Sequence, residues 1–202
     1  TPDQLPVAGP NGVIVTERAR MPAGRAALWS FAELLRIAGG VELDVEPGEL
    51  QIGLQPFVAG DEHSYRLFVA DATDNGAGYS TRLAEPAILE SVFHRIGTDI
   101  ADGFLRDSHR SRCDSSCHDC LRSYDNRRLH VYLDWRLALD VAELAAGRPL
   151  DEARWLDLVP TRADLLGELP GLTSTPVGAL RAVISQETSR AAIIGHPLWR
   201  CD

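Results

Sequence analysis

Three cysteines that lie close together are the residues of this chain best suited to chemistry. Cys113, Cys117 and Cys120 have the spacing C-x3-C-x2-C. Structural zinc sites bind Zn²⁺ tetrahedrally through four sulfur or nitrogen ligands, and short cysteine spacings commonly supply them. The spacing therefore predicts a zinc ion that fixes a loop with too little hydrophobic core of its own.

The fourth ligand has several candidates. We expect His130, the nearest well-placed nitrogen beyond the cysteines. The alternatives are His109, four residues before Cys113, then His118 between two cysteines, and Cys201 close to the end of the sequence. A catalytic zinc needs an open coordination position and a nearby acid or base, as in the H-x-E and P-C-x2-C pattern of zinc deaminases. No H-x-E accompanies these cysteines, so a structural role is expected.

A second polar motif lies where a predicted strand passes into a helix. It comprises Asp71, Asp74, Asn75, Gly76 and Gly78. The glycines permit positive backbone angles, so the chain can turn sharply there. The two aspartates could hold Mg²⁺ or act as an acid and base pair, but residues of this type more often cap a helix or shape a turn. A turn and capping role is the expectation, with a metal-dependent hydrolase as the alternative.

Arginines gather around the cysteines. From Arg106 to Arg136 there are seven arginines against five aspartates. A solvated face around the metal loop is one interpretation, and a phosphate or partner contact is the other. The residues expected to make such a contact are Arg122, Tyr124, Arg127 and Arg128. Tyr124 and the nearby Trp135 could stack on bases, although packing against the protein is the commoner use of such rings.

The composition excludes several kinds of chemistry. All 20 basic residues among the 202 are arginine. Without lysine this chain cannot house a P-loop, a Schiff-base site or the usual PD-(D/E)xK nuclease site. The net charge of -9 argues against a broad nucleic-acid-binding surface. No apolar stretch is long enough for a membrane span. The clustered cysteines and the lack of a signal-peptide pattern favour the cytoplasm.

The apolar periodicity predicts a mixed α/β (α+β) fold, with a small sheet, packed helices and a zinc-binding loop. We expect a linker or the tail of a preceding element at 1–24, a zinc-binding domain at 25–147 and a C-terminal extension of unknown type at 148–202. Both ends look cut, as in a piece of a longer polypeptide. Helices are expected over 25–38, 84–105 and 130–146, with one or two short helices beyond residue 151. Strands are expected over 65–70 and 191–195, and a hairpin is expected within 41–57 with its turn at Pro47-Gly48.

Two of these segments carry a resemblance to a known family. The run Leu-Phe-Val-Ala-Asp-Ala-Thr-Asp-Asn-Gly-Ala-Gly-Tyr-Ser and the run Cys-x3-Cys-x2-Cys-Leu-Arg-Ser-Tyr-Asp-Asn resemble the MrfA-type zinc-binding domain. That domain is typically found at the C-terminal end of superfamily 2 DEAD/DEAH-box helicases and in partner proteins of antiphage defence systems such as DISARM. The resemblance covers roughly residues 25–147. The chain departs from the four-cysteine form, because one cysteine is absent and Ser116 replaces a glycine.

The resemblance implies zinc bound by the three cysteines, with His130 replacing the missing one. It also implies a non-catalytic accessory module of an ATP-driven DNA translocase or helicase. Such a module would brace the motor, present in the same chain or a separate one, and would contact single-stranded DNA or a partner. The alternative from a different class is a free-standing adaptor subunit that binds a helicase chain and does not touch DNA. Arginines lining an exposed groove with Tyr124 would favour the strand contact, and arginines paired with acidic neighbours would favour the adaptor.

Overall fold

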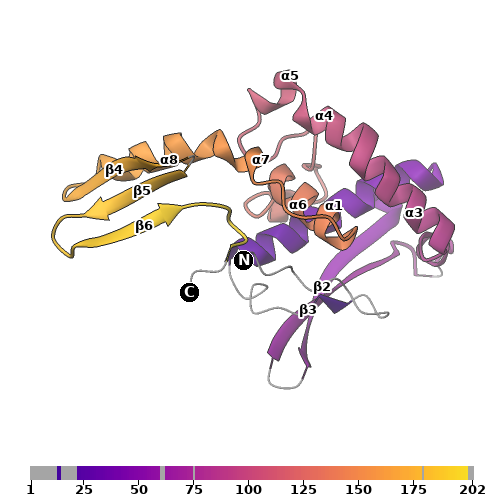
Figure 1. Ribbon diagram of the computed structural model, residues 1–202. Helices are drawn as coiled ribbons and strands as arrows, with labels where there is room; N and C mark the ends of the chain where they lie inside the picture. Colours follow the sequence, from indigo (N-terminus) through magenta and orange to yellow (C-terminus); the bar gives the residue numbers. More distant parts are fainter. Residues whose placement is uncertain (1–12, 15–21, 60–61, 75, 179, 200–202) are drawn as a thin grey trace. The chain divides into compact units, whose positions relative to one another are not determined.

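The chain divides into two units, which are described separately (Figure 1). The computed structural model describes residues 13–14, 22–59, 62–74, 76–178 and 180–199. The described residues up to Pro149 form the first unit, and those from Leu150 onward form the second. Helices and small antiparallel sheets occur in both, so the predicted α+β fold class is confirmed.

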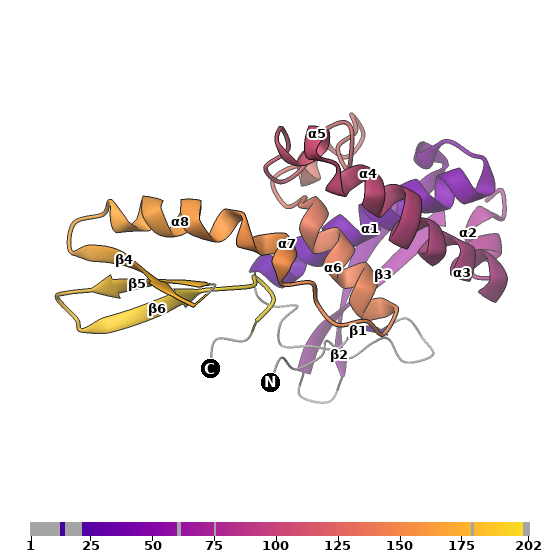
Figure 2. The ribbon, with the colours of Figure 1, turned by 45° about the horizontal axis from the view of Figure 1, so that its top comes forward.

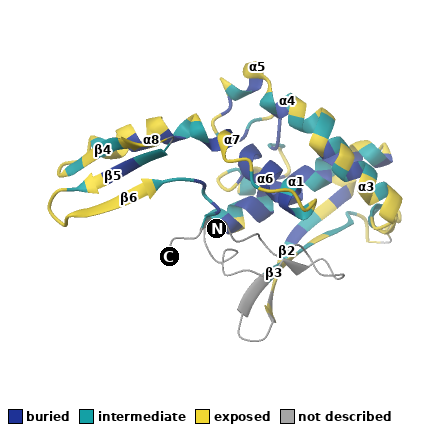
Figure 3. Cartoon of the chain, viewed as in Figure 1, coloured by how far each residue is buried: buried dark blue, intermediate teal, exposed yellow. Residues whose placement is uncertain are grey.

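Two helices form the centre of the first unit. Helix α1 (Pro22–Leu43) packs against α6 (Trp135–Ala145), and the two run side by side in Figures 1 and 2. Their facing sides are buried (Figure 3). Leu34 of α1 and Trp135 of α6 are completely buried. Apolar residues at helical spacing drive this packing, because each helix removes one apolar stripe from water.

Helix α1 is longer than the sequence indicates. The helix was expected over residues 25–38, but it continues through Gly39-Gly40 to Leu43. A Cβ atom at Gly39 would lie 3.1 Å from the Leu83 side chain, and one at Gly40 would lie 3.0 Å from a backbone oxygen. These glycines therefore allow close packing and do not cap the helix.

The expected hairpin within 41–57 is wrong, because helix α1 extends to Leu43 and takes up the start of the first arm. Residues Pro47–Glu49 form a short 3₁₀ helix, and only the second arm is a strand, β2 (Leu50–Ala59). Its partner is β3 (Glu62–Asp71), which includes the expected strand over 65–70. The pairing runs from Leu50 opposite Asp71 to Ala59 opposite Glu62. Strand β1 (Val13–Ile14) adds to the other edge of β3, and α1 packs on β2 and β3.

A long helical stretch follows the sheet, as expected for 84–105. After α2 (Tyr79–Leu83), helix α3 (Pro86–Arg95) continues through a π-helical turn at Ile96–Ile100 into α4 (Ala101–Leu105). One turn of helix, α5 (Asp107–Arg110), then leads into the cysteine loop. The expected helix over 130–146 begins later, at Trp135, because the Asp134 carboxylate caps it by accepting the Arg136 N–H at 2.8 Å.

The second unit contains two helices and three strands among its described residues. Helix α8 (Leu158–Gly167), which follows α7 (Ala153–Leu156), packs on a sheet of strand order β4-β5-β6. The strands are β4 (Leu172–Val177), β5 (Leu180–Ser185) and β6 (Arg190–Ile194). Strand β6 matches the expected strand over 191–195. After it, the Trp199 N–H donates to the His196 carbonyl at 3.0 Å and closes a turn.

Within the described part of the chain, no helix has the length and apolar character needed to cross a membrane.

Candidate metal centre

The three cysteine thiols converge in the first unit. The Sγ atoms of Cys113 and Cys120 are 3.8 Å apart, and those of Cys120 and Cys117 are 3.7 Å apart. A disulfide would bring two sulfurs to about 2.05 Å, and all three cysteines are free. With a Zn–S bond of about 2.3 Å, two sulfurs on a tetrahedral zinc ion lie about 3.8 Å apart. The thiols therefore have the separation of two edges of a zinc tetrahedron.

The fourth member of the cluster is His109. Its ring nitrogen and the three sulfurs all lie within 4.8 Å of one another. Helix α5 positions it: the Cys113 N–H donates to the His109 carbonyl at 3.0 Å, so the two side chains are one helical turn apart. The sequence contained this signal, because His109 precedes Cys113 by four residues. The local helix that makes this spacing useful was not predicted.

The hydrogen bonds of His109 leave one nitrogen for a metal. Its Nδ1 lies 2.9 Å from the carbonyl oxygen of Phe104. A carbonyl only accepts, so Nδ1 carries the proton and Nε2 of the neutral ring carries the lone pair. Nε2 is buried and has no hydrogen-bond partner among the described residues. Histidines that bind metals typically donate their other ring N–H to a carbonyl or carboxylate, which orients the ring in this way.

The pKa values of two of the thiols are raised, which favours their neutral form unless a cation is present. Burial raises the pKa of the Cys113 thiol, and the nearby Cys120 raises it further. Burial also raises the pKa of Cys120 to about 11, although the Cys117 N–H donates to its sulfur at 3.0 Å and partly offsets this effect. A divalent cation would supply the charge that stabilises the thiolates. Three thiols and one unprotonated imidazole nitrogen are a ligand set that suits zinc.

The expected fourth ligand, His130, makes hydrogen bonds to the loop after the cysteines. Its Nε2 lies 3.0 Å from the Ser123 carbonyl oxygen and 2.9 Å from the Asn126 Oδ1 atom. Both atoms accept, so Nε2 carries a proton and is not the nitrogen that could bind a metal. Among the described residues, the cluster that could hold a metal contains His109 and not His130. The Asn126 amide also donates to the Leu121 carbonyl. His130 therefore fastens the loop that follows the cysteines. His118 is exposed, and Cys201 lies outside the described residues.

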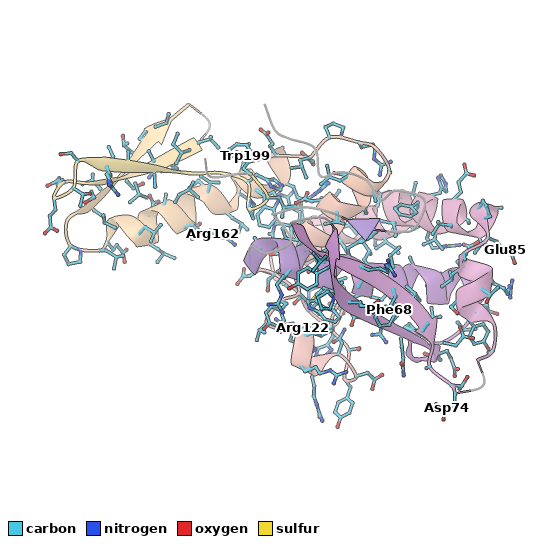
Figure 4. The ribbon with its side chains drawn as sticks, turned by 90° about the horizontal axis from the view of Figure 1, so that it is seen from below. Phe68, Asp74, Glu85, Arg122, Arg162 and Trp199 are labelled. Atoms are coloured by element: carbon cyan, nitrogen blue, oxygen red, sulfur yellow. The ribbon has the colours of Figure 1, made fainter. Side chains whose placement is uncertain are left out.

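The motif that begins at Asp71 forms a turn in which both carboxylate oxygens of Asp71 are already hydrogen-bonded. The Asp71 carboxylate accepts the backbone N–H groups of Gly78, Tyr79 and Ser80 at the start of α2. These bonds, foremost those from Ser80, lower the pKa of Asp71. Gly76 and Gly78 have positive φ angles of 61° and 80°, which the turn requires. Asp74 is exposed and lies well apart from Arg122 in Figure 4. Asn75 lies outside the described residues.

The expected contact residues lie on the loop after the cysteines. Arg127 and Arg128 are exposed, and the Arg127 guanidinium lies 4.6 Å from the centre of the Tyr124 ring. Tyr124 is 74% exposed. Arg122 is half-buried and donates from Nε to the Ser116 hydroxyl at 2.9 Å. Trp135, the other ring considered for base stacking, is fully buried and is therefore a core residue.

Comparisons with known proteins identify the same region. Residues 31–121 match the family model of the MrfA Zn-binding domain. The chain is also 32% identical over 123 residues to the Druantia protein DruE of Escherichia coli (strain UMEA 4076-1). That alignment covers 59% of this chain but only 6% of the relative, so the chain spans a small part of the relative's length. No solved structure matches the chain significantly.

Proposed function

From the MrfA Zn-binding domain that residues 31–121 carry, we propose that this chain is a zinc-stabilised accessory module of an antiphage defence or helicase-related protein. In this proposal His109, Cys113, Cys117 and Cys120 bind one zinc ion that holds the loop in place. The module does not catalyse a reaction. It acts in the cytoplasm, where it braces a helicase motor in the same chain or a separate one.

The convergence of four ligand atoms supports this proposal most strongly. Two of the sulfur–sulfur separations fit a zinc tetrahedron, and the three sulfurs and a ring nitrogen of His109 all lie within 4.8 Å of one another. The Nε2 atom of His109 is buried and has no partner among the described residues. A buried polar atom without a partner is unfavourable, and a zinc ion removes that cost by accepting the lone pair. The ligand set is complete with four protein atoms, which is typical of structural rather than catalytic zinc.

The finer part of the proposal is contact with a single DNA strand through Arg122, Tyr124, Arg127 and Arg128. No ion pair to an acidic residue is recorded for these arginines within the described ranges. Arg127 and Arg128 are exposed beside the exposed Tyr124, and such an arrangement suits phosphates and bases. This observation favours strand contact over a free-standing adaptor that avoids DNA. The saturated carboxylate of Asp71 favours a turn over a hydrolase site.

Fluorescence anisotropy with a labelled single-stranded oligonucleotide tests the strand contact. The Arg127→Ala/Arg128→Ala pair should weaken binding and reduce the salt slope of log K by about 1.4, because two phosphate contacts are lost. Arg82→Ala/Arg190→Ala removes the same charge from exposed positions elsewhere and should have a smaller effect. If both double variants lost the same amount of affinity for the oligonucleotide, the loss would come from net charge alone, and the adaptor would be favoured.

A further inference from the structure

The loop that carries the cysteines is held along its backbone by the first turn of α6. Three consecutive carbonyls accept hydrogen bonds from two residues of that turn. Trp135 donates from Nε1 to the Cys113 carbonyl at 3.3 Å and from its backbone N–H to the Ser115 carbonyl at 2.8 Å. Arg136 donates from Nη1 to the Asp114 carbonyl at 2.6 Å. The backbone between Cys113 and Ser115 is therefore fixed at each residue.

These donors are themselves rigid. Trp135 is completely buried, and the Arg136 guanidinium lies 4.3 Å from its ring centre. The Trp135 ring also packs edge-on against His109, with ring centres 5.6 Å apart. The first turn of α6 is attached to α1, because the Asp134 N–H donates to the Ser30 hydroxyl. That hydroxyl in turn donates to the Ala26 carbonyl at 2.7 Å.

We propose that Trp135 and Arg136 are positioning residues of the zinc site, which together form a clamp that sets zinc affinity. Their donors hold the backbone that leads from Cys113 toward Cys117, and the Trp135 ring holds His109. The clamp thus restricts the conformations open to the sulfurs and Nε2 before the metal binds. Both residues lie outside the matched range 31–121, so the functional zinc site extends to α6. The clamp is independent of any motor or DNA strand.

The physical basis is preorganisation. A metal site whose ligands are already placed spends less of its binding free energy on ordering the chain, so its affinity is higher. Hydrogen bonds in the outer shell of a metal site typically change metal affinity about 10–100-fold when they are removed. Outer-shell bonds of that kind usually reach the ligand side chains, whereas the clamp bonds reach backbone carbonyls of the cysteine loop. The clamp touches a ligand side chain only through the packing of the Trp135 ring on His109.

The test measures zinc dissociation constants by chelator competition on the 202-residue chain. The variants are Trp135→Phe, which keeps an aromatic ring but lacks the Nε1 donor, and Arg136→Met, which keeps the aliphatic stem but lacks the guanidinium. Leu139→Ala is the control, because Leu139 is buried in α6 and its apolar side chain donates no hydrogen bond. Melting curves of the metal-free proteins are recorded alongside, with the absorption spectrum of bound Co²⁺.

We expect both clamp variants to bind zinc about 10–100-fold more weakly and to alter the Co²⁺ spectrum. Leu139→Ala should lower the melting temperature of the metal-free chain without a matching loss of affinity. Equal zinc affinity in all variants would overturn the clamp. The clamp would also be overturned if Leu139→Ala bound zinc as weakly as the clamp variants, because the loss of zinc affinity would then follow only from the loss of stability. Failure to bind DNA or a motor would overturn the proposed function and leave the clamp standing.

Discussion

The cysteine cluster and the Asp71 turn are two polar motifs of the same unit, and they differ in how their lone pairs are used. In the turn, both carboxylate oxygens of Asp71 accept backbone N–H groups. In the cluster, three sulfurs face one another and the buried Nε2 of His109 has no partner among the described residues. Lone pairs already satisfied by the backbone indicate a structural turn. Lone pairs that converge on one point indicate a place for a cation.

The largest effect is expected from removing a ligand. Cys117→Ser should abolish stoichiometric zinc binding and weaken affinity by more than about 100-fold, since even outer-shell losses reach 10–100-fold. The loop should lose its fold as well, because structural zinc contributes folding free energy directly. Elemental analysis and a thermal melt measure both effects. An unchanged melt with zinc removed would contradict a structural metal.

Removing the metal itself should separate the two motifs. After treatment with a zinc chelator, trypsin is expected to cleave fastest at the exposed arginines of the cysteine region, such as Arg112, Arg127 and Arg128. Arg82, an exposed arginine in the helix that follows the Asp71 turn, serves as the internal control. Mass spectrometry of early fragments reads the order of cleavage. Early cleavage at Arg82 to the same degree would mean that zinc stabilises the whole unit evenly.

The smallest effect is expected at the turn. Asp71→Asn should lower the melting temperature at pH 7 and leave zinc content unchanged, whereas Asp74→Asn, at an exposed position, should change neither the melting temperature nor the zinc content. Because the folded-state pKa of Asp71 is lowered, its contribution is present above the unfolded value of about 3.9. The contribution is lost as the pH falls through the folded value. The difference in melting temperature between wild type and Asp71→Asn should therefore shrink in acid. Zinc loss in Asp71→Asn would contradict the separation of the two motifs.

Much of the fold and of the site could be predicted from local sequence patterns. The spacing of residues close in sequence predicted the apolar stripe of α1, the strand β3 and the three cysteines of the cluster. The failures depend on contacts between distant residues. Gly39-Gly40 continues a helix because Leu83 and a later backbone oxygen pack against it. His130 was preferred to His109 because sequence shows neither the Ser123 and Asn126 acceptors that engage one ring nor the Phe104 carbonyl that orients the other.

With His109 as the fourth ligand, the proposed site would differ from the four-cysteine form of the resembled domain in one donor. An imidazole one helical turn before Cys113 would supply the ligand that a cysteine would otherwise supply, and a neutral nitrogen would leave the site with one negative charge fewer. His109→Cys should therefore retain zinc, because a thiolate at this position restores a four-sulfur site. Zinc content and the charge-transfer bands of the Co²⁺-loaded variant measure this outcome. A His109→Cys chain that loses zinc would place the fourth ligand elsewhere.

The most direct test compares the zinc content of His109→Ala with that of His130→Ala, by elemental analysis of the purified chains. His130→Ala is expected to retain one zinc per chain, because its Nε2 only fastens the loop. His109→Ala is expected to lose zinc or to release it to a weak chelator. The reverse result, with zinc kept in His109→Ala and lost in His130→Ala, would contradict the metal centre described above.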